Sequence, residues 1–474
     1  MIKQTIKFNS PNRYFGGFLQ NLINQSEITG SVTQTNNELT LLLDNSDEKK
    51  VVEFNELVSK YLPHSIFLDE INTAQTNEEI NNKKFTSPTY NIAPCNKCIE
   101  LLTVPSSPEY LNESLKCTHY SNENEESFED YTIFSPHYSE GSSILITDSS
   151  KINDLFIITE DEVKTLFSIE KPTIKVTIKD ETLKELTKKQ FINIKAPYNN
   201  RSALAALNAK EAEVNYMFFH STGDLNMVVV QKNHTIIKAN RVATKLEDLD
   251  KDPQINRFLN IAKEANFTKE AIGANLSTNG INFIVTNELG SKKVINFQNF
   301  KLESFFFGLH NDTIKNKLLG NFYDKYPHIE DKLSNTLEMG LFELVCLLLD
   351  IENKNSQENT AFEELCNKSF EFRGNGGLKI DMHFNSEGFD YVSMLSSIMS
   401  FRLAGADTHY IAYSIFEAFG DMAISTLNQL KEKFKCDNII MQGDLFANSV
   451  LYSRILSKYQ LANPYFPKAI ALDE

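Results

Sequence analysis

The stretch IKQTIKFNSPNRYFGGFLQNLINQSEITGSVTQTNNELTLLL, residues 2–43, decides the fold of the first domain. Ile2–Phe8 alternates apolar and polar residues as a strand does, and Phe15–Ile23 has the apolar spacing of a helix. A second strand is expected near Ser31, and Glu38–Leu43 reads as a third. Two strands flank one helix, and a further strand follows them directly.

The chain beyond this stretch repeats the pattern once. Val51–Tyr61 has helical spacing, and Ser65–Ile71 reads as a closing strand. The order β-α-β-β-α-β is that of a ferredoxin-like fold over residues 1–75. Residues 73–93 are polar and rich in asparagine, which is typical of a linker.

The rest of the chain indicates mixed α+β and α/β domains. At 474 residues and about 100–200 residues per domain, three or four domains are expected. Residues 94–140 have too little apolar content to fold without a staple or a neighbour. From residue 246 the chain becomes more helical. The further expected elements are the strands Ser143–Thr147, Leu155–Ile158, Thr173–Ile178, Asn226–Val230 and Ile439–Met441, the helices Ser202–Glu213 and Asn448–Tyr459, a buried apolar segment Leu337–Leu349, and a long helix that ends near Cys436.

Composition excludes several classes of function. The net charge of −16 and the absence of a basic run argue against a nucleic-acid partner. No continuous apolar segment is long enough to span a membrane, and the N-terminal residues have no signal-peptide pattern. The six cysteines are sparse, which suits a reducing cytoplasm. We therefore expect a cytoplasmic protein without direct membrane insertion.

The strongest chemical signal is a Cys-x-x-Cys knuckle. Cys95 and Cys98 have the spacing that places two thiolates on one turn, and Cys117 follows downstream. A fourth cysteine is missing, and either His119 or His137 could supply the last ligand of a tetrahedral zinc site. The alternative is a knuckle that has decayed and holds no metal.

A turn near the C-terminus carries a weaker signal. Met441–Asn448, MQGDLFAN, lies between an expected strand and an expected helix, where glycine-rich turns cradle phosphates. Gly443 and Asn448 are the candidate nucleotide contacts. A single glycine followed by Asp444 makes a poor cradle, because a carboxylate repels phosphate. The alternative is an ordinary turn in which Asn448 caps the helix.

Taken in order, these segments resemble the HypF family, carbamoyltransferases that help to make the cyanide ligands of [NiFe]-hydrogenases. The resemblance implies an acylphosphatase-like domain over residues 1–75 and a zinc-finger-like region over 76–142. It also implies a reduced YrdC-like domain over 143–245 and a Kae-like domain, of the actin and hexokinase type, over 246–474.

The N-terminal half of the resemblance lacks family residues that bind phosphate. Asn12–Leu19 occupies the place of the acylphosphatase phosphate loop, with Leu19 where the family has its catalytic arginine and Gln34 where it has an asparagine. The first zinc finger is matched by Cys95 and Cys98 and the next knuckle by Cys117, but the family's second finger has no counterpart.

The YrdC-like match rests on two short segments. Leu166–Pro172 resembles the segment LxSxxRP, with Lys171 in place of its arginine, and Ala196-Pro197-Tyr198 resembles LPYTP. The chain is short here for an intact domain that would bind ATP and form a carbamoyl adenylate.

The C-terminal match is the clearest. Glu358–Leu365 resembles EGxAAMxLE, and Thr408–Lys433 resembles the family's AxxFHNTLAE helix, with Phe416 in place of the histidine. Met441–Asn448 resembles SGGVFQN with one glycine lost. The metal-binding aspartate, the paired histidines and the DGTGYG-type loop of the family have no counterparts.

The losses all fall on phosphate, metal or carbamoyl contacts, so the resemblance implies a scaffold without catalytic residues. The sequence resembles the HypF-like accessory proteins called HydE in epsilonproteobacteria. The expected partners are hydrogenase subunits or other maturation factors, with zinc as the possible cofactor and ATP binding doubtful. Two alternatives stand beside this one: a surviving ATP-dependent carbamoyltransferase, and a zinc-dependent interaction module unrelated to hydrogenases.

Overall fold

We describe the chain from a computed structural model. The described residues are 1–35, 37–80, 85–87, 92–117, 119–120, 132–221, 227–231, 234–239, 245–267, 269–278, 280–296, 300–353, 358–385, 388–458 and 464–472.

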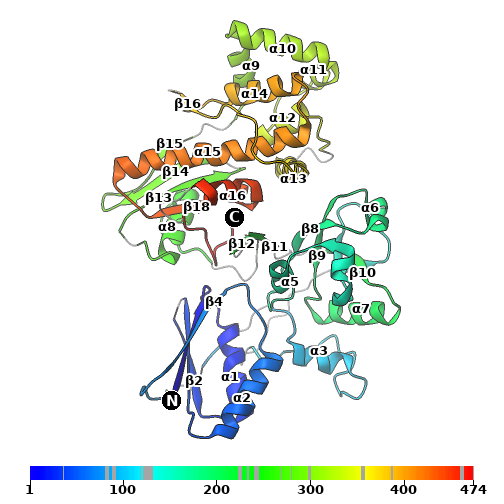
Figure 1. The fold of residues 1–474 in the computed structure, drawn as a ribbon, viewed down its shortest axis with the longest axis vertical. Helices are drawn as coiled ribbons and strands as arrows, with labels where there is room; N and C mark the ends of the chain where they lie inside the picture. Colours follow the sequence, from blue (N-terminus) through cyan, green and yellow to red (C-terminus); the bar gives the residue numbers. More distant parts are fainter. Residues whose placement is uncertain are drawn as a thin grey trace. The chain divides into compact units, whose positions relative to one another are not determined.

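The chain divides into two compact units (Figure 1). Unit 1 comprises Met1–Lys245 together with Lys468–Leu472, and unit 2 comprises Leu246–Pro467. Mixed α/β structure is present in both, as the sequence predicts. The finer division into four domains remains a prediction.

Unit 1 begins with a four-stranded antiparallel sheet in the order β2-β3-β1-β4. The connectivity is the ferredoxin-like one predicted from the sequence. Figure 1 shows α1 and α2 together on one face of this sheet. The elements are β1 (Ile2–Phe8), α1 (Tyr14–Ser26), β2 (Gly30–Thr35), β3 (Glu38–Leu43), α2 (Glu48–Tyr61) and β4 (Leu68–Gln75).

The closing strand differs from its predicted bounds. It was expected at Ser65–Ile71, but β4 spans Leu68–Gln75 and pairs with β1 as far as Ile2. Every β4 residue from Asp69 to Gln75 is exposed, so no apolar alternation marked the strand in the sequence. The strand thus runs into the expected linker, and Phe85, also in that segment, is buried in unit 1.

The second sheet of unit 1 has six strands among the described residues, in the order β5-β10-β6-β9-β8-β7. A two-stranded hairpin, β11-β12, attaches to it through a hydrogen bond from the Val228 amide to the Thr173 carbonyl. The elements here are α3 (Asn96–Thr103), β5 (Thr132–Ser135), β6 (Ser143–Ile146), α4 (Ile152–Leu155), β7 (Phe156–Ile157), α5 (Glu160–Leu166), β8 (Ile174–Ile178), α6 (Glu181–Thr187), β9 (Phe191–Lys195), α7 (Asn200–Glu211), β10 (Tyr216–Ser221), β11 (Met227–Gln231) and β12 (His234–Ala239).

A short tail completes unit 1. Lys468–Leu472 belongs to unit 1, although the residues before it belong to unit 2. The Leu472 amide donates to the Ile237 carbonyl at 2.7 Å, and Ala469 lies in the unit 1 core. The Lys468 ammonium lies 2.8 Å from the Asp69 carboxylate. The chain therefore leaves unit 1, forms unit 2, and returns.

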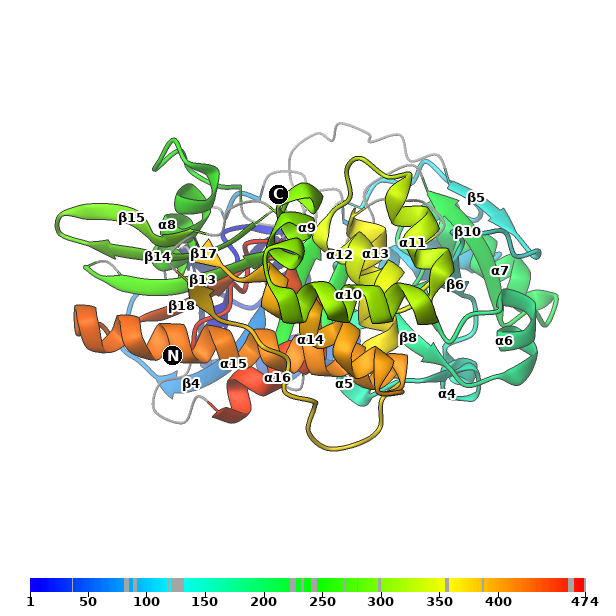
Figure 2. The same ribbon diagram turned by 90° about the horizontal axis from the view of Figure 1, so that it is seen from above.

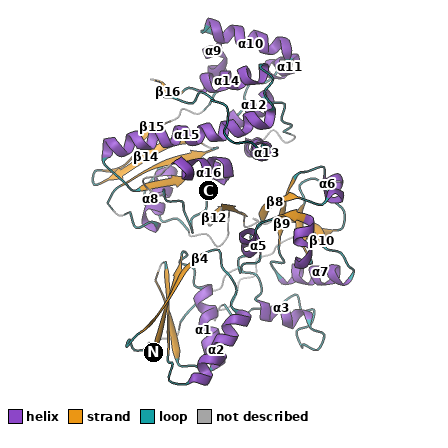
Figure 3. Cartoon of the chain, viewed as in Figure 1, coloured by secondary structure: helices purple, strands orange, loops and turns teal. Residues whose placement is uncertain are grey.

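Unit 2 combines a small sheet with many helices. Its sheet has the order β15-β14-β13-β18, with β13 and β18 parallel. Figure 2 shows the long helix α15 running along this sheet, and Figure 3 shows how helical the region from α9 to α14 is. The elements are α8 (Pro253–Glu264), β13 (Ala271–Ser277), β14 (Gly280–Asn287), β15 (Gly290–Asn296), α9 (Leu302–His310), α10 (Thr313–Lys325), α11 (Pro327–Ser334), α12 (Leu341–Leu348), α13 (Glu358–Phe370), β16 (Phe384–Asn385), β17 (Gly388–Phe389), α14 (Tyr391–Leu403), α15 (Thr408–Phe434), β18 (Ile439–Gln442) and α16 (Ser449–Lys458).

One buried segment was predicted too long. Leu337–Leu349 was expected to be buried throughout, but Leu337 is 95% exposed and α12 begins only at Leu341. The Glu343 carboxylate accepts the Gly340 amide at 2.9 Å, which fixes the helix start there. Leu337 thus precedes the helix and lies outside the core. No helix within the described ranges has the length and apolar content to cross a membrane.

Candidate metal centre and filled turns

The Cys-x-x-Cys knuckle lies at the start of α3. Cys95 is the residue that precedes the helix, and Cys98 lies in its first turn. Both side chains are buried in the unit 1 core. A helix start places residues three apart on one face, so the two sulfurs point to the same side.

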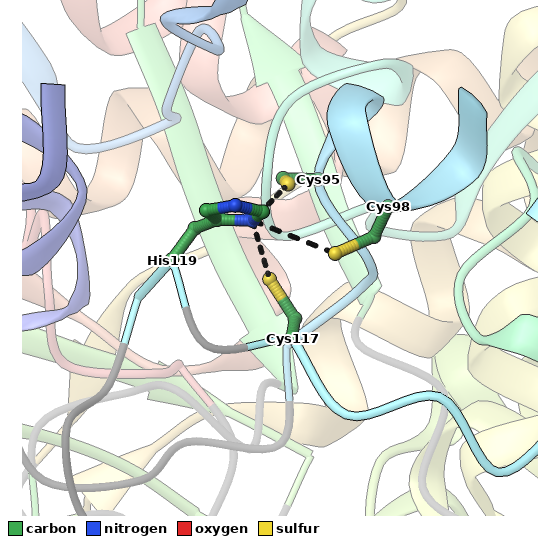
Figure 4. Close-up of side chains that lie close together, drawn as sticks. All are labelled: Cys95, Cys98, Cys117 and His119. Carbon is green, nitrogen blue, oxygen red and sulfur yellow. Dashed lines mark hydrogen bonds between the residues drawn. The ribbon is translucent and has the colours of Figure 1, made fainter. Parts of the chain in front are cut away.

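Cys117 and His119 complete the cluster (Figure 4). The His119 Nδ1 atom lies 3.1 Å from the sulfur of Cys95, 3.5 Å from that of Cys98 and 3.7 Å from that of Cys117. The four possible ligand atoms all lie within 4.8 Å of one another. His137 was the other candidate for the fourth position, but its side chain is exposed and stands outside this group.

The geometry and donor chemistry fit a tetrahedral zinc ion. Three sulfurs and one imidazole nitrogen make the Cys3His set of structural zinc sites. Hydrogen bonds from Cys95 and Cys98 hold the pKa of the Cys117 thiol well below its usual range. A hydrogen bond to Cys117, with one to Cys95, raises the pKa of His119 to about 9. The Cys117 sulfur thus carries the negative charge in the metal-free cluster, because the same hydrogen bonds raise the pKa of the Cys98 thiol. Zinc binding would release the protons that the other thiols and His119 hold.

The cluster is packed against the first helix of unit 1. The Phe18 ring on α1 packs edge-on against the His119 ring, with 6.5 Å between the ring centroids. It also packs at a tilt against the Tyr120 ring, with 5.3 Å between the centroids. A metal here would cross-link α3 to the loop that carries Cys117 and His119, and that loop packs on α1 through Phe18. This is the staple that the sequence predicts for a segment with little apolar content.

The turn after β1 is filled by a side chain of its own domain. The Gln34 amide on β2 donates to the carbonyls of Ser10 and Asn12, at 3.1 and 3.0 Å. Anion-binding turns instead present backbone N–H groups to the ligand. Leu19, at the predicted arginine position, is 2% exposed and lies in the core. Within this turn, the Gln34 amide therefore occupies the carbonyls of Ser10 and Asn12.

The Lys171 side chain also binds to its own backbone segment. Its ammonium donates to the Phe167 carbonyl at 2.9 Å and lies 5.6 Å from the Phe167 ring centroid. Burial lowers its pKa to about 8, although the Glu170 charge acts in the opposite direction. The side chain therefore lies in the protein interior.

Glu170, the preceding residue, links the segment after α5 to α1 and to the segment before β4. Its buried carboxylate accepts the Tyr14 hydroxyl at 2.6 Å, the Ser65 hydroxyl at 2.5 Å and the Ile66 amide at 3.0 Å. Burial raises its pKa, and the three hydrogen bonds oppose that rise. No local residue spacing predicts this contact, because its partners are distant along the chain.

In unit 2 the turn after β18 is closed from within. The Asp444 carboxylate accepts the Thr278 amide at 2.8 Å and the Thr278 hydroxyl at 2.5 Å. Gly443 has a φ of +108°, and a Cβ there would lie 2.1 Å from the Leu276 carbonyl oxygen. The turn is therefore bound tightly to the end of β13, with a carboxylate inside it.

The other predicted nucleotide contact is a helix cap. The Asn448 side chain accepts the amides of Val450 and Leu451 at 2.9 and 3.2 Å, at the start of α16. It is fully buried and also donates to the Ser369 hydroxyl. Phe416, at the predicted histidine position on α15, is buried against Phe362. The side-chain amide of Asn448 is engaged by the protein itself.

Comparison with solved structures identifies the fold. A full-length HypF in its phosphate- and nucleotide-bound form superposes with a TM-score of 0.54, over 100% of this chain and 96% of that one. HypF of T. kodakarensis superposes with a TM-score of 0.62 and the same coverage. The chain has the HypF fold. Sequence identity to these two structures is only 12% and 11%, so the likeness is one of fold.

One curated relative is similar in sequence. Protein HydE of Wolinella succinogenes is 25% identical over 167 residues. That match covers 33% of this chain and 29% of HydE, so it spans less than a third of the relative. No family model matches the chain. The filled turns thus lie in a chain that keeps the HypF fold along its whole length.

Proposed function

We propose that this protein is a non-catalytic accessory factor in [NiFe]-hydrogenase maturation, built on the HypF scaffold. The HypF fold over the full chain and the partial similarity to HydE support this assignment. Its expected partners are immature hydrogenase subunits or other maturation factors, which it would hold or bridge.

The observation that carries the proposal is the set of filled turns. Gln34 binds the carbonyls of the first turn, and the Asp444 carboxylate lies in the turn of unit 2. Phosphoryl and carbamoyl transfer require preorganised donors that stabilise developing negative charge. Here the same positions present carbonyl and carboxylate oxygens. A scaffold that is selected for shape alone would tolerate this arrangement.

We assign zinc a structural role. Cys95, Cys98, Cys117 and His119 would supply all four ligands, which leaves no position for a reactive water. The metal would cross-link α3 to the loop that carries Cys117. The cluster's residues pack with α1, so loss of zinc should lower the stability of unit 1.

The test of the function is genetic. Deletion of the gene should abolish [NiFe]-hydrogenase activity, and expression of the intact chain should restore it. The variants Asp444→Asn and Gln34→Asn alter the filled turns and should also restore activity. Normal hydrogenase activity in the deletion strain would overturn the proposal.

The carbamoyltransferase alternative has a direct assay. The purified protein should not convert ATP to AMP in the presence of carbamoyl phosphate, while a HypF enzyme in the same assay should do so. Robust turnover by the folded protein would show that residues outside the filled turns carry chemistry.

A further inference from the structure

The outer edge of β4 has no partner in the described part of the chain. The Thr76 amide donates to the Met1 carbonyl, so Met1 and Thr76 form a hydrogen-bonded pair of the β1–β4 ladder. In an antiparallel pair such residues alternate with residues that point away. By the register, Ala74 and Asn72 point toward β1, while Ile71, Thr73 and Gln75 direct their N–H and C=O groups outward.

The strand is bare on both faces as well as at this edge. All side chains from Asp69 to Gln75 are exposed, and Ile71 is 57% exposed. Natural proteins protect edge strands with lysines, prolines or bulges. Residues 71–75 contain no lysine or proline, and the irregularity in the β1–β4 register lies outside them, between Ile6 and Phe8. The edge is therefore a template for another strand.

Charge indicates which strand would fit. Residues 68–80, LDEINTAQTNEEI, hold four acidic residues and no basic one. Lys7 pairs with Asp69 and Lys3 with Glu78, which leaves the exposed Glu70 and Glu79 without a basic neighbour in the described ion pairs. Pairing between two copies would set these acidic strands side by side, where like charges destabilise a sheet. A basic strand is favoured instead.

We propose that β4 is a docking edge that takes an extended, lysine- or arginine-rich segment of a partner protein as a fifth strand. Main-chain hydrogen bonds at Ile71, Thr73 and Gln75 would supply the affinity, as in other cases of strand addition. Glu70 would select for basic side chains. The eight residues of β4 match a segment of similar length. The edge of β4 would accept such a segment from any partner protein that carries it.

The test uses the full-length protein and synthetic peptides as probes. The first is a peptide of alternating lysine and valine, as long as β4. The second has the same sequence with alternate amides N-methylated along one edge, and the third has glutamate in place of lysine. Hydrogen exchange at the amides of Ile71, Thr73 and Gln75 should slow about tenfold or more with saturating basic peptide. The N-methylated and acidic peptides should give no comparable protection.

Two variants separate docking from folding. Thr73→Pro removes one outward amide and should weaken peptide binding about fivefold or more. Protection of the inward-paired amides of Lys3 and Thr5 reports that the sheet is intact. Glu70→Lys, an exposed substitution, should weaken binding about two- to fivefold. Equal binding of basic and acidic peptides, or protection that appears only as the protein concentration rises, would overturn the proposal.

Discussion

Glu170 is a buried residue whose carboxylate links distant segments of unit 1. Its carboxylate accepts three hydrogen bonds while fully buried, and a buried donor that loses its acceptor costs about 1–3 kcal/mol. Glu170→Ala leaves three such donors and should lower the free energy of unfolding of unit 1 by roughly 3 kcal/mol or more. Urea unfolding measures this, with the exposed Glu160→Ala as the control.

The pH dependence of the same residue has a definite sign. Burial raises the folded pKa of Glu170 above its ordinary value of 4.5, so the folded state retains a proton that the unfolded state releases. Stability from this group is complete below pH 4.5 and is lost as the pH rises through the raised pKa. The slope of unfolding free energy against pH should flatten in Glu170→Gln. An unchanged slope would show that another group titrates there.

The four side chains of the metal site allow a direct test of zinc binding. Cys98→Ala removes one buried ligand, and the purified protein should lose stoichiometric zinc. His137→Ala removes an exposed histidine outside the cluster and should retain it. Metal analysis by mass spectrometry compares the two. Equal zinc in both variants would place the metal elsewhere.

Among elements, the turn after β18 is held by one carboxylate. Asp444→Ala leaves the amide and hydroxyl of Thr278 without their acceptor, and should lower the free energy of unfolding of unit 2 by about 1–3 kcal/mol. Asp437→Ala breaks a surface pair with Lys431 and should cost at most about 1 kcal/mol. Chemical denaturation of the two variants gives the comparison. Similar losses in both would contradict a special role for Asp444.

The tail is the element that closes unit 1. A chain that ends at Pro467 loses the buried side chains of Ile470 and Leu472 and the hydrogen bond to Ile237. Burial of each such side chain contributes about 1.5–3 kcal/mol, so loss of the two should lower the free energy of unfolding of unit 1 by roughly 3–6 kcal/mol. Hydrogen exchange in β11–β12 should accelerate in the truncated protein. Unchanged exchange there would show that the hairpin is stable without the tail.

Helices and strands were predictable from the sequence where burial of one face makes apolar residues recur at regular spacing. Ile2–Phe8 and Glu38–Leu43 have their predicted bounds because one face of each strand is buried. The predicted bounds of β4 were wrong because its residues are exposed on both faces, so no apolar alternation marks the strand. The Cys-x-x-Cys knuckle was visible because ligand spacing is local. The contacts of Asp444 with Thr278 and of Glu170 with Tyr14 join distant residues, and no local spacing encodes them.

At the scale of the whole molecule, the two units should respond separately to metal. All four candidate ligands lie in unit 1, so a strong chelator should destabilise unit 1 and leave unit 2 unchanged. Hydrogen exchange of the full chain, measured before and after chelation, reports on the two units separately. Faster exchange in β13–β15 after chelation would show that the units are coupled.

The fold class was predicted from the resemblance, whereas the return of the tail to unit 1 had no signal in the sequence.

That return makes unit 2 an insertion within unit 1. A ribosome must synthesise the whole of Leu246–Pro467 before Lys468–Leu472 exists to fill its place beside Ile237 and Asp69. Unit 1 therefore begins to form first and is completed last. During that interval β12 and its neighbours expose apolar surface that the finished protein buries, and this is when a nascent chain would need the protection of a chaperone.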